Sequence, residues 1–207
     1  MVYVKPDQGT FGMGVMRVEK MAEHHYKYQA GEKARTFDSM RGLYASIRGK
    51  QIKNRYLAQR GIHLLKHRGR RFDIRVMVQM SPTGTWESTG LIGRVAHPGK
   101  IVTNYHSGGK PMAVETLLKS HMNASESAAL VSKLKTIGVQ TAQQMARSYP
   151  RVKEIGLDVA LDQQHHPWLL EVNTKPDPYI FLKLRNRAVY RKVIRYARAY
   201  GGVKAKR

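Results

Sequence analysis

Two short segments near the C-terminus, joined by a polar loop, place the tightest constraint on the fold. Apolar and polar side chains alternate in residues 157–162 and again in residues 170–173, which is typical of β-strands. A hairpin of these strands brings Asp158 close to Glu171, and the period of two puts Glu171 and Asn173 on one face. Three oxygen-bearing side chains on one patch suit Mg²⁺ or Mn²⁺. An ordinary solvated hairpin face has the same spacing, so these residues alone leave both interpretations open.

A glycine-rich loop near the N-terminus adds a second constraint. A short apolar strand ends at Lys5, and a loop with Gly9, Gly12 and Gly14 leads into another apolar segment. Glycines let backbone N–H groups approach phosphate oxygens, and a lysine adds a positive charge. Neither Gly-Lys-Ser/Thr nor a helical pattern follows, which excludes a Walker loop and a dinucleotide fingerprint. The pattern predicts a flap over phosphates, although plain hairpin turns also use such glycines.

Taken in order along the chain, these residues resemble the ATP-grasp fold. More narrowly, the chain is similar to the endospore coat-associated YheC/YheD-type ATP-grasp proteins, from about residue 2 to about residue 200. The resemblance rests on the Lys5 strand with its glycine loop, on Gly108-Gly109, and on residues 59–64, 72–79, 86–90, 94–96, 102–104, 158 and 171–176.

The resemblance implies an α+β chain with two α/β lobes and antiparallel sheets, the first lobe being incomplete. We expect a partial nucleotide-binding lobe with the flap over residues 1–65. We expect a C-terminal lobe with the metal site and a basic C-terminal helix over residues 66–207. Relatives carry a further domain and a second phosphate-binding lysine before the Lys5 strand, so ATP binding by this chain alone is expected to be weak.

The nucleotide site follows from the resemblance, residue by residue. Lys5 and the amides of residues 9–14 would hold the β- and γ-phosphates. Gln59, Gly61 and Ile62 match the family's hinge, where backbone groups bind adenine. A buried edge strand would give the same local pattern at the hinge.

Four further polar residues match positions near the phosphates. Asp73 and Arg75 share one strand face, and because an unpaired buried charge is costly, a paired or ligand-facing role is expected. In relatives the residue matching Arg75 organises the phosphate or second-substrate side, and the one matching Arg94 meets developing negative charge. Asn104 resembles an asparagine that contacts phosphates. The alternative for Arg94 and Asn104 is that they are ordinary polar residues on the surface without a role in binding.

The implied chemistry is that of a carboxylate–amine ligase. Two Mg²⁺ ions held by Asp158, Glu171 and Asn173 would bridge the phosphates of ATP during transfer to an unidentified carboxylate. An unidentified amine would then attack the acylphosphate, giving an amide. The stretch Lys175-Pro176-Asp177-Pro178 replaces the Pro-Gly of many such ligases, so second-substrate recognition is not carried over. The alternative is a non-catalytic basic binding or structural protein of the spore coat, or a polyanion binder, that keeps an ATP-grasp shell.

Charge and composition limit the classes of partner that the chain is expected to bind. Lys and Arg number 37 against 14 Asp and Glu, a net charge of +23, which attracts polyanions. A basic C-terminal helix over residues 183–198 fits either a solvated face or a nucleic-acid surface. Acidic spore-coat components are expected partners, and specific nucleic acid is not. Cysteine is absent and no apolar run approaches the ~20 residues of a membrane span, so the expectation is a cytoplasmic protein that associates with the spore coat.

Two helices and one irregular stretch complete the expectations. A helix over residues 40–50 would be capped by Asp38 or Ser39, and a long helix over residues 125–149 would be capped by Ser125. Residues 21–36 are polar and are expected to form a loop or a poor strand.

Overall fold

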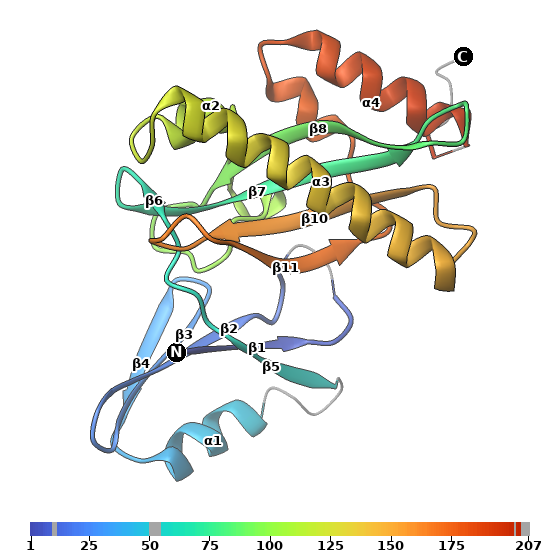
Figure 1. Ribbon diagram of the computed structural model, residues 1–207. Coiled ribbons are helices and arrows are strands. Elements are labelled where there is room, and N and C mark those ends of the chain that lie inside the picture. The colour runs from blue at the N-terminus through green and yellow to red at the C-terminus, as the bar shows by residue number, and fades with distance from the viewer. Residues whose placement is uncertain (10–11, 50–54, 201, 204–207) are drawn as a thin grey trace. The chain divides into compact units, whose positions relative to one another are not determined.

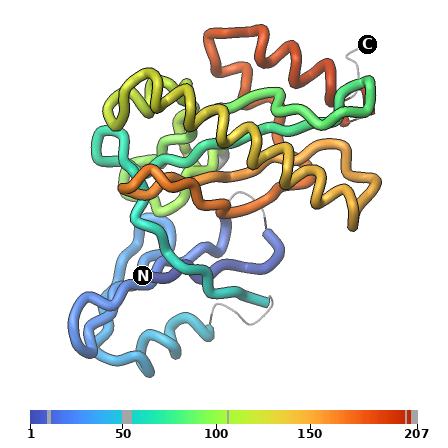
Figure 2. Tube along the Cα trace, in the orientation of Figure 1, coloured from blue at the N-terminus to red at the C-terminus, as the bar shows by residue number. Residues whose placement is uncertain are grey.

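The structure is a computed structural model that describes residues 1–9, 12–49, 55–200 and 202–203. The chain divides into two compact units (Figures 1 and 2). Unit 1 comprises Met1–His63 and Ala96–Lys110, and unit 2 comprises Leu64–Val95 and Pro111–Arg207. Each unit carries its own sheet, so the expected α+β class is confirmed.

Unit 1 is built on a five-stranded sheet in the order β4-β3-β2-β1-β5, with antiparallel neighbours. Leu43 and Ile47, one turn apart on α1, pack against Met16, Val18 and Tyr28 of the sheet. Ser39 caps α1, because its Oγ accepts a hydrogen bond from the backbone N–H of Gly42 at 3.1 Å. The elements are β1 (Val2–Pro6), β2 (Met16–Ala22), β3 (His25–Ala30), β4 (Lys33–Phe37), α1 (Met40–Arg48), β5 (Tyr56–Arg60) and the 3-10 turn η1 (Tyr105–Ser107).

Of the two structures expected for residues 21–36, a loop or a poor strand, the strand is the one that forms, as β3 and β4. Tyr26, Tyr28 and Ala30 alternate with polar residues and pack into the core of unit 1. This burial of two aromatic rings stabilises a strand whose other face is polar.

Unit 2 holds a larger sheet in the order β11-β10-β7-β8-β9, with β6 paired to β7. β7 is antiparallel to both β8 and β10, and β10 is antiparallel to β11. The elements are β6 (Lys66–His67), β7 (Arg70–Met80), β8 (Trp86–Val95), β9 (Lys110–Met112), α2 (Val114–Leu118), α3 (Ala124–Ser148), β10 (Glu154–Leu161), β11 (Pro167–Asn173), the 3-10 turn η2 (Tyr179–Lys183) and α4 (Arg187–Ala199).

Both faces of the unit 2 sheet are covered by helices (Figure 1). Val76 and Leu157 point to the side of α3 and belong to the same core cluster as its Leu134. Met77, the neighbour of Val76, points to the opposite side and packs with Val193 of α4. Because side chains alternate across a strand, β7 is buried on both faces. No helix in the described parts of the chain is long and apolar enough to cross a membrane.

The basic C-terminal helix is shorter than predicted. A 3-10 turn occupies residues 179–183, and α4 begins only at Arg187. Asn186 sets this start, because its Oδ1 accepts a hydrogen bond from the backbone N–H of Ala188 at 3.0 Å.

The long helix α3 begins one residue before the predicted start, and its cap is Asn123 rather than Ser125. The Asn123 Oδ1 accepts from the Glu126 N–H at 2.9 Å, and the Glu126 Oε2 accepts from the Asn123 N–H at 2.9 Å. This reciprocal pair is a capping box, which satisfies two N–H groups that the helix itself leaves without partners.

We expect Asn123→Ala to lower the free energy of unfolding by about 1 kcal/mol, the usual cost of losing an N-cap. Ser125→Ala is the matched control and should change it by less than about 0.5 kcal/mol. Urea denaturation followed by circular dichroism measures both. Equal effects of the two variants would show that the capping box does not stabilise α3.

Candidate functional site

Four charged side chains meet on one face of the unit 2 sheet. β7 lies between β8 and β10, and its register pairs Asp73 with Arg94 and Arg75 with Asp158. Asp73 and Arg75 are two residues apart, so both point to the same side. The sheet register therefore brings together residues from three strands that lie far apart in the sequence. We call these four residues the charge cluster.

The charge cluster is tightly bonded and buried. Arg94 donates to both carboxylate oxygens of Asp73, from Nε at 2.8 Å and from Nη2 at 2.5 Å. Its Nη2 also lies 2.8 Å from Oδ2 of Asp158, whose Oδ1 accepts from Arg75 Nε at 2.6 Å. No side chain of the four is more than 9% exposed. Two positive and two negative charges balance each other inside the sheet.

Ion pairing in the cluster favours the charged forms of Asp158 and Arg94. Burial alone would raise the pKa of Asp158, but Arg94 and Arg75 outweigh it and hold that pKa below its ordinary value. Burial likewise opposes the charge on Arg94, but Asp73 and Asp158 raise the pKa of its guanidinium. Both shifts favour the charged forms of Asp158 and Arg94.

The three predicted metal ligands lie on this same face. Glu171 is the direct partner of Asp158 across the β10/β11 pair, and Asn173 is opposite Gly156. Glu171 is exposed. The Asn173 Nδ2 donates to the Gly156 carbonyl at 3.4 Å, which leaves the amide oxygen as the end that can bind a ligand. The structure thus brings Asp158, Glu171 and Asn173 onto one hairpin face, and metal binding there stays a prediction.

The donor set fits Mg²⁺ that is shared with a phosphate. Within the described residues, no three His, Asp or Glu side chains are placed to hold a metal ion alone. Both oxygens of Asp158 already accept from arginines, which makes Asp158 a weaker ligand than Glu171. Protein-bound Mg²⁺ commonly uses one or two carboxylates together with substrate phosphates and water. Glu171, Asn173 and one oxygen of Asp158 match that requirement.

Unit 1 brings the glycine loop against Asn104. Gly12 and Gly14 have φ of 71° and 74°, a left-handed conformation that favours glycine. A Cβ on Gly12 would lie 2.9 Å from Oδ1 of Asn104 and 3.1 Å from Val102. Two predicted phosphate-contacting features therefore adjoin each other. Thr10 and Phe11 of the predicted flap lie outside the described residues.

The remaining unit 1 predictions lie on the β1/β5 pair. Lys5 is opposite Leu57, and Gln59 is opposite Tyr3. Gly61 follows β5 and donates its N–H to the Met1 carbonyl at 3.1 Å. Ile62 is half-buried beside it. Adenine binding by this hinge stays a prediction.

Sequence reasoning missed Lys100. A cavity of about 260 Å³ lies in unit 1, bordered by Gly12, Gly14, Tyr28, Tyr56, Lys100 and Val102. The Lys100 Nζ donates to the Ser107 carbonyl at 3.0 Å, so the ammonium is held beside the glycine loop. The signal in the sequence is the Pro98-Gly99 turn, which sets Lys100 just ahead of the residues 102–104 that carry the resemblance.

Comparisons with known proteins identify the family. The family model described as YheC/D like ATP-grasp matches residues 1–201. The chain is 25% identical over 187 residues to the endospore coat-associated protein YheD of Bacillus subtilis (strain 168), covering 87% of this chain and 40% of that protein. It is 20% identical over 176 residues to the endospore coat-associated protein YheC of the same organism, covering 84% of this chain and 48% of that protein. The chain thus spans less than half the length of these relatives.

Two solved structures are also similar. The first is the C-terminal domain of K. lactis Pby1, an ATP-grasp enzyme interacting with the mRNA decapping enzyme Dcp2. It has a TM-score of 0.47 at 16% identity, with 93% of this chain and 53% of that chain covered. The second is N5-carboxyaminoimidazole ribonucleotide synthetase from Thermotoga maritima. It has a TM-score of 0.43 at 11% identity, with 96% of this chain and 39% of that chain covered.

Proposed function

Because the chain belongs to the YheC/D-like ATP-grasp family, we propose that it binds ATP with Mg²⁺ and joins a carboxylate to an amine. The observation that carries this proposal is the charge cluster beside the exposed Glu171. Buried ion pairs are poor stabilisers compared with apolar residues of similar size. A folding role alone therefore gives little reason to keep four buried charges next to three candidate metal ligands.

Each residue has a role in the proposed reaction. Lys5, Lys100 and the N–H groups of the glycine loop bind phosphate oxygens, and Asn104 orients the loop. Arg75 uses its Nε on Asp158, and because a guanidinium has five N–H donors, further donors remain for a transferred phosphoryl group. Asp158 and Asp73 hold the two arginines in place. When bound by Glu171 and Asn173, Mg²⁺ neutralises charge on the phosphates.

The proposed chemistry needs no protein nucleophile. A carboxylate oxygen of the substrate attacks the γ-phosphorus, and the bond from that phosphorus to the ADP oxygen breaks. The amine then attacks the acyl carbon, inorganic phosphate leaves, and the amine nitrogen loses a proton to solvent. Positioning and fixed positive charge supply the rate enhancement.

Charge favours a second candidate, a basic spore-coat protein that keeps the ATP-grasp shell without turnover. The net charge of +23 far exceeds what nucleotide binding requires, and both curated relatives carry coat association in their names. Release of ADP with a carboxylate and an amine present separates the two candidates, because only the ligase produces ADP. Acidic coat components are the proposed partners in either case.

Calorimetric titration with ATP, with and without Mg²⁺, tests nucleotide binding directly. We expect binding that requires Mg²⁺. Lys5→Ala should weaken it by about 1.5–3 kcal/mol, or roughly 10- to 150-fold in Kd, the scale of a charge-assisted hydrogen bond. Lys33→Ala removes an exposed lysine from β4 of the same sheet and is the matched control. Equal affinities of the two variants would remove Lys5 from the site, and no Mg²⁺-dependent heat at all would contradict the proposal.

A further inference from the structure

The C-terminal end of the chain is entirely free of acidic residues. Asp177 is the last one, and residues 178–207 contain ten of the 37 basic residues. The resulting excess of positive charge in this segment is not spread evenly over the surface. Much of it lies on α4, which has no acidic residue in its first turn or elsewhere.

Four arginines of α4 form a single exposed row. Arg187, Arg191, Arg195 and Arg198 are all exposed and follow each other at spacings of four, four and three residues, which places them on one side of a helix. With a rise of 1.5 Å per residue, the row is about 16 Å long. We call these four residues the arginine ridge.

The arginine ridge works against the stability of its own helix. Like charges one turn apart repel each other, and Arg187 sits at the N-terminus, where the helix dipole disfavours a cation. In the part of the chain that the structure describes, no carboxylate forms an ion pair with any of the four. Lys192 differs, since its Nζ lies 2.9 Å from Oε2 of Glu87. Arg187 also donates to the Leu182 carbonyl, and Arg195 lies 5.3 Å from the centre of the Tyr196 ring. Neither contact neutralises a positive charge, so the fold does not explain why four arginines stand in one row.

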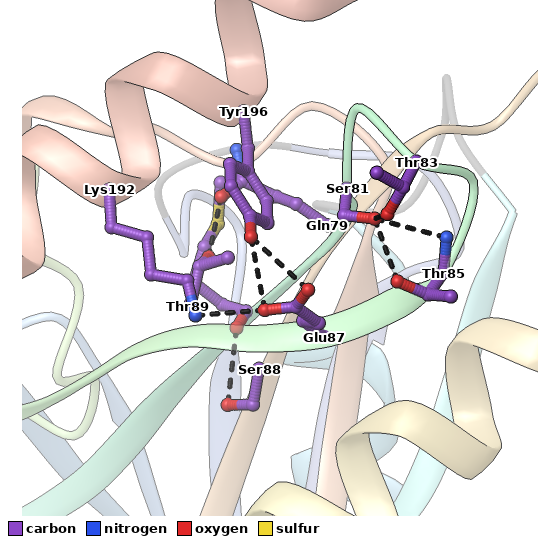
Figure 3. A network of polar contacts seen from close by, with 10 residues as sticks. Gln79, Ser81, Thr83, Thr85, Glu87, Ser88, Thr89, Lys192 and Tyr196 are labelled. Atoms are coloured by element: carbon purple, nitrogen blue, oxygen red, sulfur yellow. Dashed lines mark hydrogen bonds and ion pairs between the residues drawn. The ribbon is translucent and has the colours of Figure 1, made fainter.

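The opposite side of α4 is fixed to the sheet (Figure 3). The Tyr196 hydroxyl and Lys192 both donate to the Glu87 carboxylate, at 3.1 Å and 2.9 Å. The Gln79 Nε2 donates to the Val193 carbonyl at 3.1 Å. Val193, Ile194 and Ala197 are buried beside these bonds. The ridge thus projects from a helix that is held in place.

These contacts discriminate between kinds of partner. Helices that bind membrane surfaces insert an apolar face, and the apolar face of α4 is already buried in the protein. The centres of protein–protein interfaces are depleted of charge and rich in large apolar residues, whereas only alanines, Ala188 and Ala199, are exposed among the ridge arginines. Protein–nucleic acid interfaces are polar and strongly positive. Arginine also matches phosphate with two parallel hydrogen bonds.

We propose that the arginine ridge binds the phosphate backbone of nucleic acid without reading its sequence. Phosphate contacts fix position but carry no sequence information. The ridge has no Asn or Gln among its arginines to recognise adenine, and because arginine can also pair with guanine, comparison with a scrambled duplex tests whether bases are read. This activity is separate from ATP binding and uses none of the residues of the charge cluster.

The test uses the full chain and a labelled 20-base-pair DNA duplex, with binding followed by fluorescence anisotropy between about 50 and 200 mM KCl. The triple variant Arg187→Gln/Arg191→Gln/Arg195→Gln should reduce the slope of log K against log salt by about 2.7, because each lost phosphate contact reduces it by about 0.9. Affinity at the lowest salt should fall at least ~10-fold. The variant should melt close to the wild type, since relief of repulsion along α4 offsets the lost contacts of Arg187 with the Leu182 carbonyl and of Arg195 with the Tyr196 ring.

The matched control removes equal charge from the other face of the sheet. Lys133→Gln/Lys135→Gln/Arg147→Gln changes three exposed residues of α3, and we expect its slope to stay within about 0.9 of the wild type. Equal losses in both triple variants would overturn the proposal in favour of net charge alone. Stronger binding to one duplex than to its scrambled sequence would contradict backbone recognition. Phosphatidylserine vesicles and polyglutamate test the other partners. If the ridge binds either of them with the affinity that it has for DNA, that partner replaces nucleic acid in the proposal.

Discussion

Arg94→Met is expected to lower the free energy of unfolding by about 3–5 kcal/mol, the cost of breaking a buried ion pair on one side. Arg94 bonds both Asp73 and Asp158, so its removal leaves two carboxylates with one guanidinium between them. Methionine keeps most of the volume, which limits the cavity contribution. Urea denaturation at neutral pH measures the effect. Arg151→Met, at an exposed position of the same unit, should stay within about 0.5 kcal/mol of the wild type.

Acid titration of the wild type and of Arg94→Met tests whether the lost ion pairs cause the destabilisation. The pKa of Asp158 is lowered in the folded state by Arg94 and Arg75 despite burial. Its stabilising contribution is therefore present above the unfolded carboxyl pKa of ~3.9 and is lost as pH falls through the lower folded value. Without Arg94 this depression shrinks, so the variant should lose less stability on acidification than the wild type. A loss at neutral pH of under about 1 kcal/mol would show that the cluster is solvated.

Glu171→Gln is expected to abolish the Mg²⁺ dependence of ATP binding while leaving stability within about 0.5 kcal/mol. The substitution keeps the shape of an exposed side chain and removes the carboxylate charge that a hard cation needs. Paired calorimetric titrations with and without Mg²⁺, together with a melting curve, measure both effects.

Glu115→Gln is the control for this prediction. It removes one exposed carboxylate from α2 of the same unit and should bind Mg²⁺ and ATP as the wild type does. Unchanged Mg²⁺ dependence in Glu171→Gln would move the metal site away from the β10/β11 hairpin.

The hairpin was predictable from the local alternation of apolar and polar residues. The register between more distant strands was not predictable from the sequence. The period of two in residues 157–162 and 170–173 predicted both strands and the shared face of Asp158 and Glu171, and the register confirms this placement. The convergence of Arg75 and Arg94 on Asp158 depends on the register of β7 with two other strands. Register is set by burial and turn geometry over long sequence separations, so the separate motifs did not reveal that these residues bond each other.

Local signals compete at the start of α3 and in residues 21–36. Asn123 and Glu126 carry the spacing of a capping box, but Ser125 lies between them and is also a favourable cap residue, so it competes as the start of α3. In residues 21–36 the many polar residues favour a loop, whereas the alternating Tyr26, Tyr28 and Ala30, which pack into the core, favour a strand. In both segments the pattern that forms is present in the sequence beside a competing one.

The charge cluster also limits how the sequence can change over time. Replacing any one of its four members leaves a net buried charge, but removing one acid and one base together leaves a neutral pair, such as Arg75 with Asp158 or Arg94 with Asp73. The smallest well-tolerated step is therefore a double substitution of opposite sign. Such a requirement slows divergence at these positions, and relatives that have lost one member should have lost an oppositely charged partner as well.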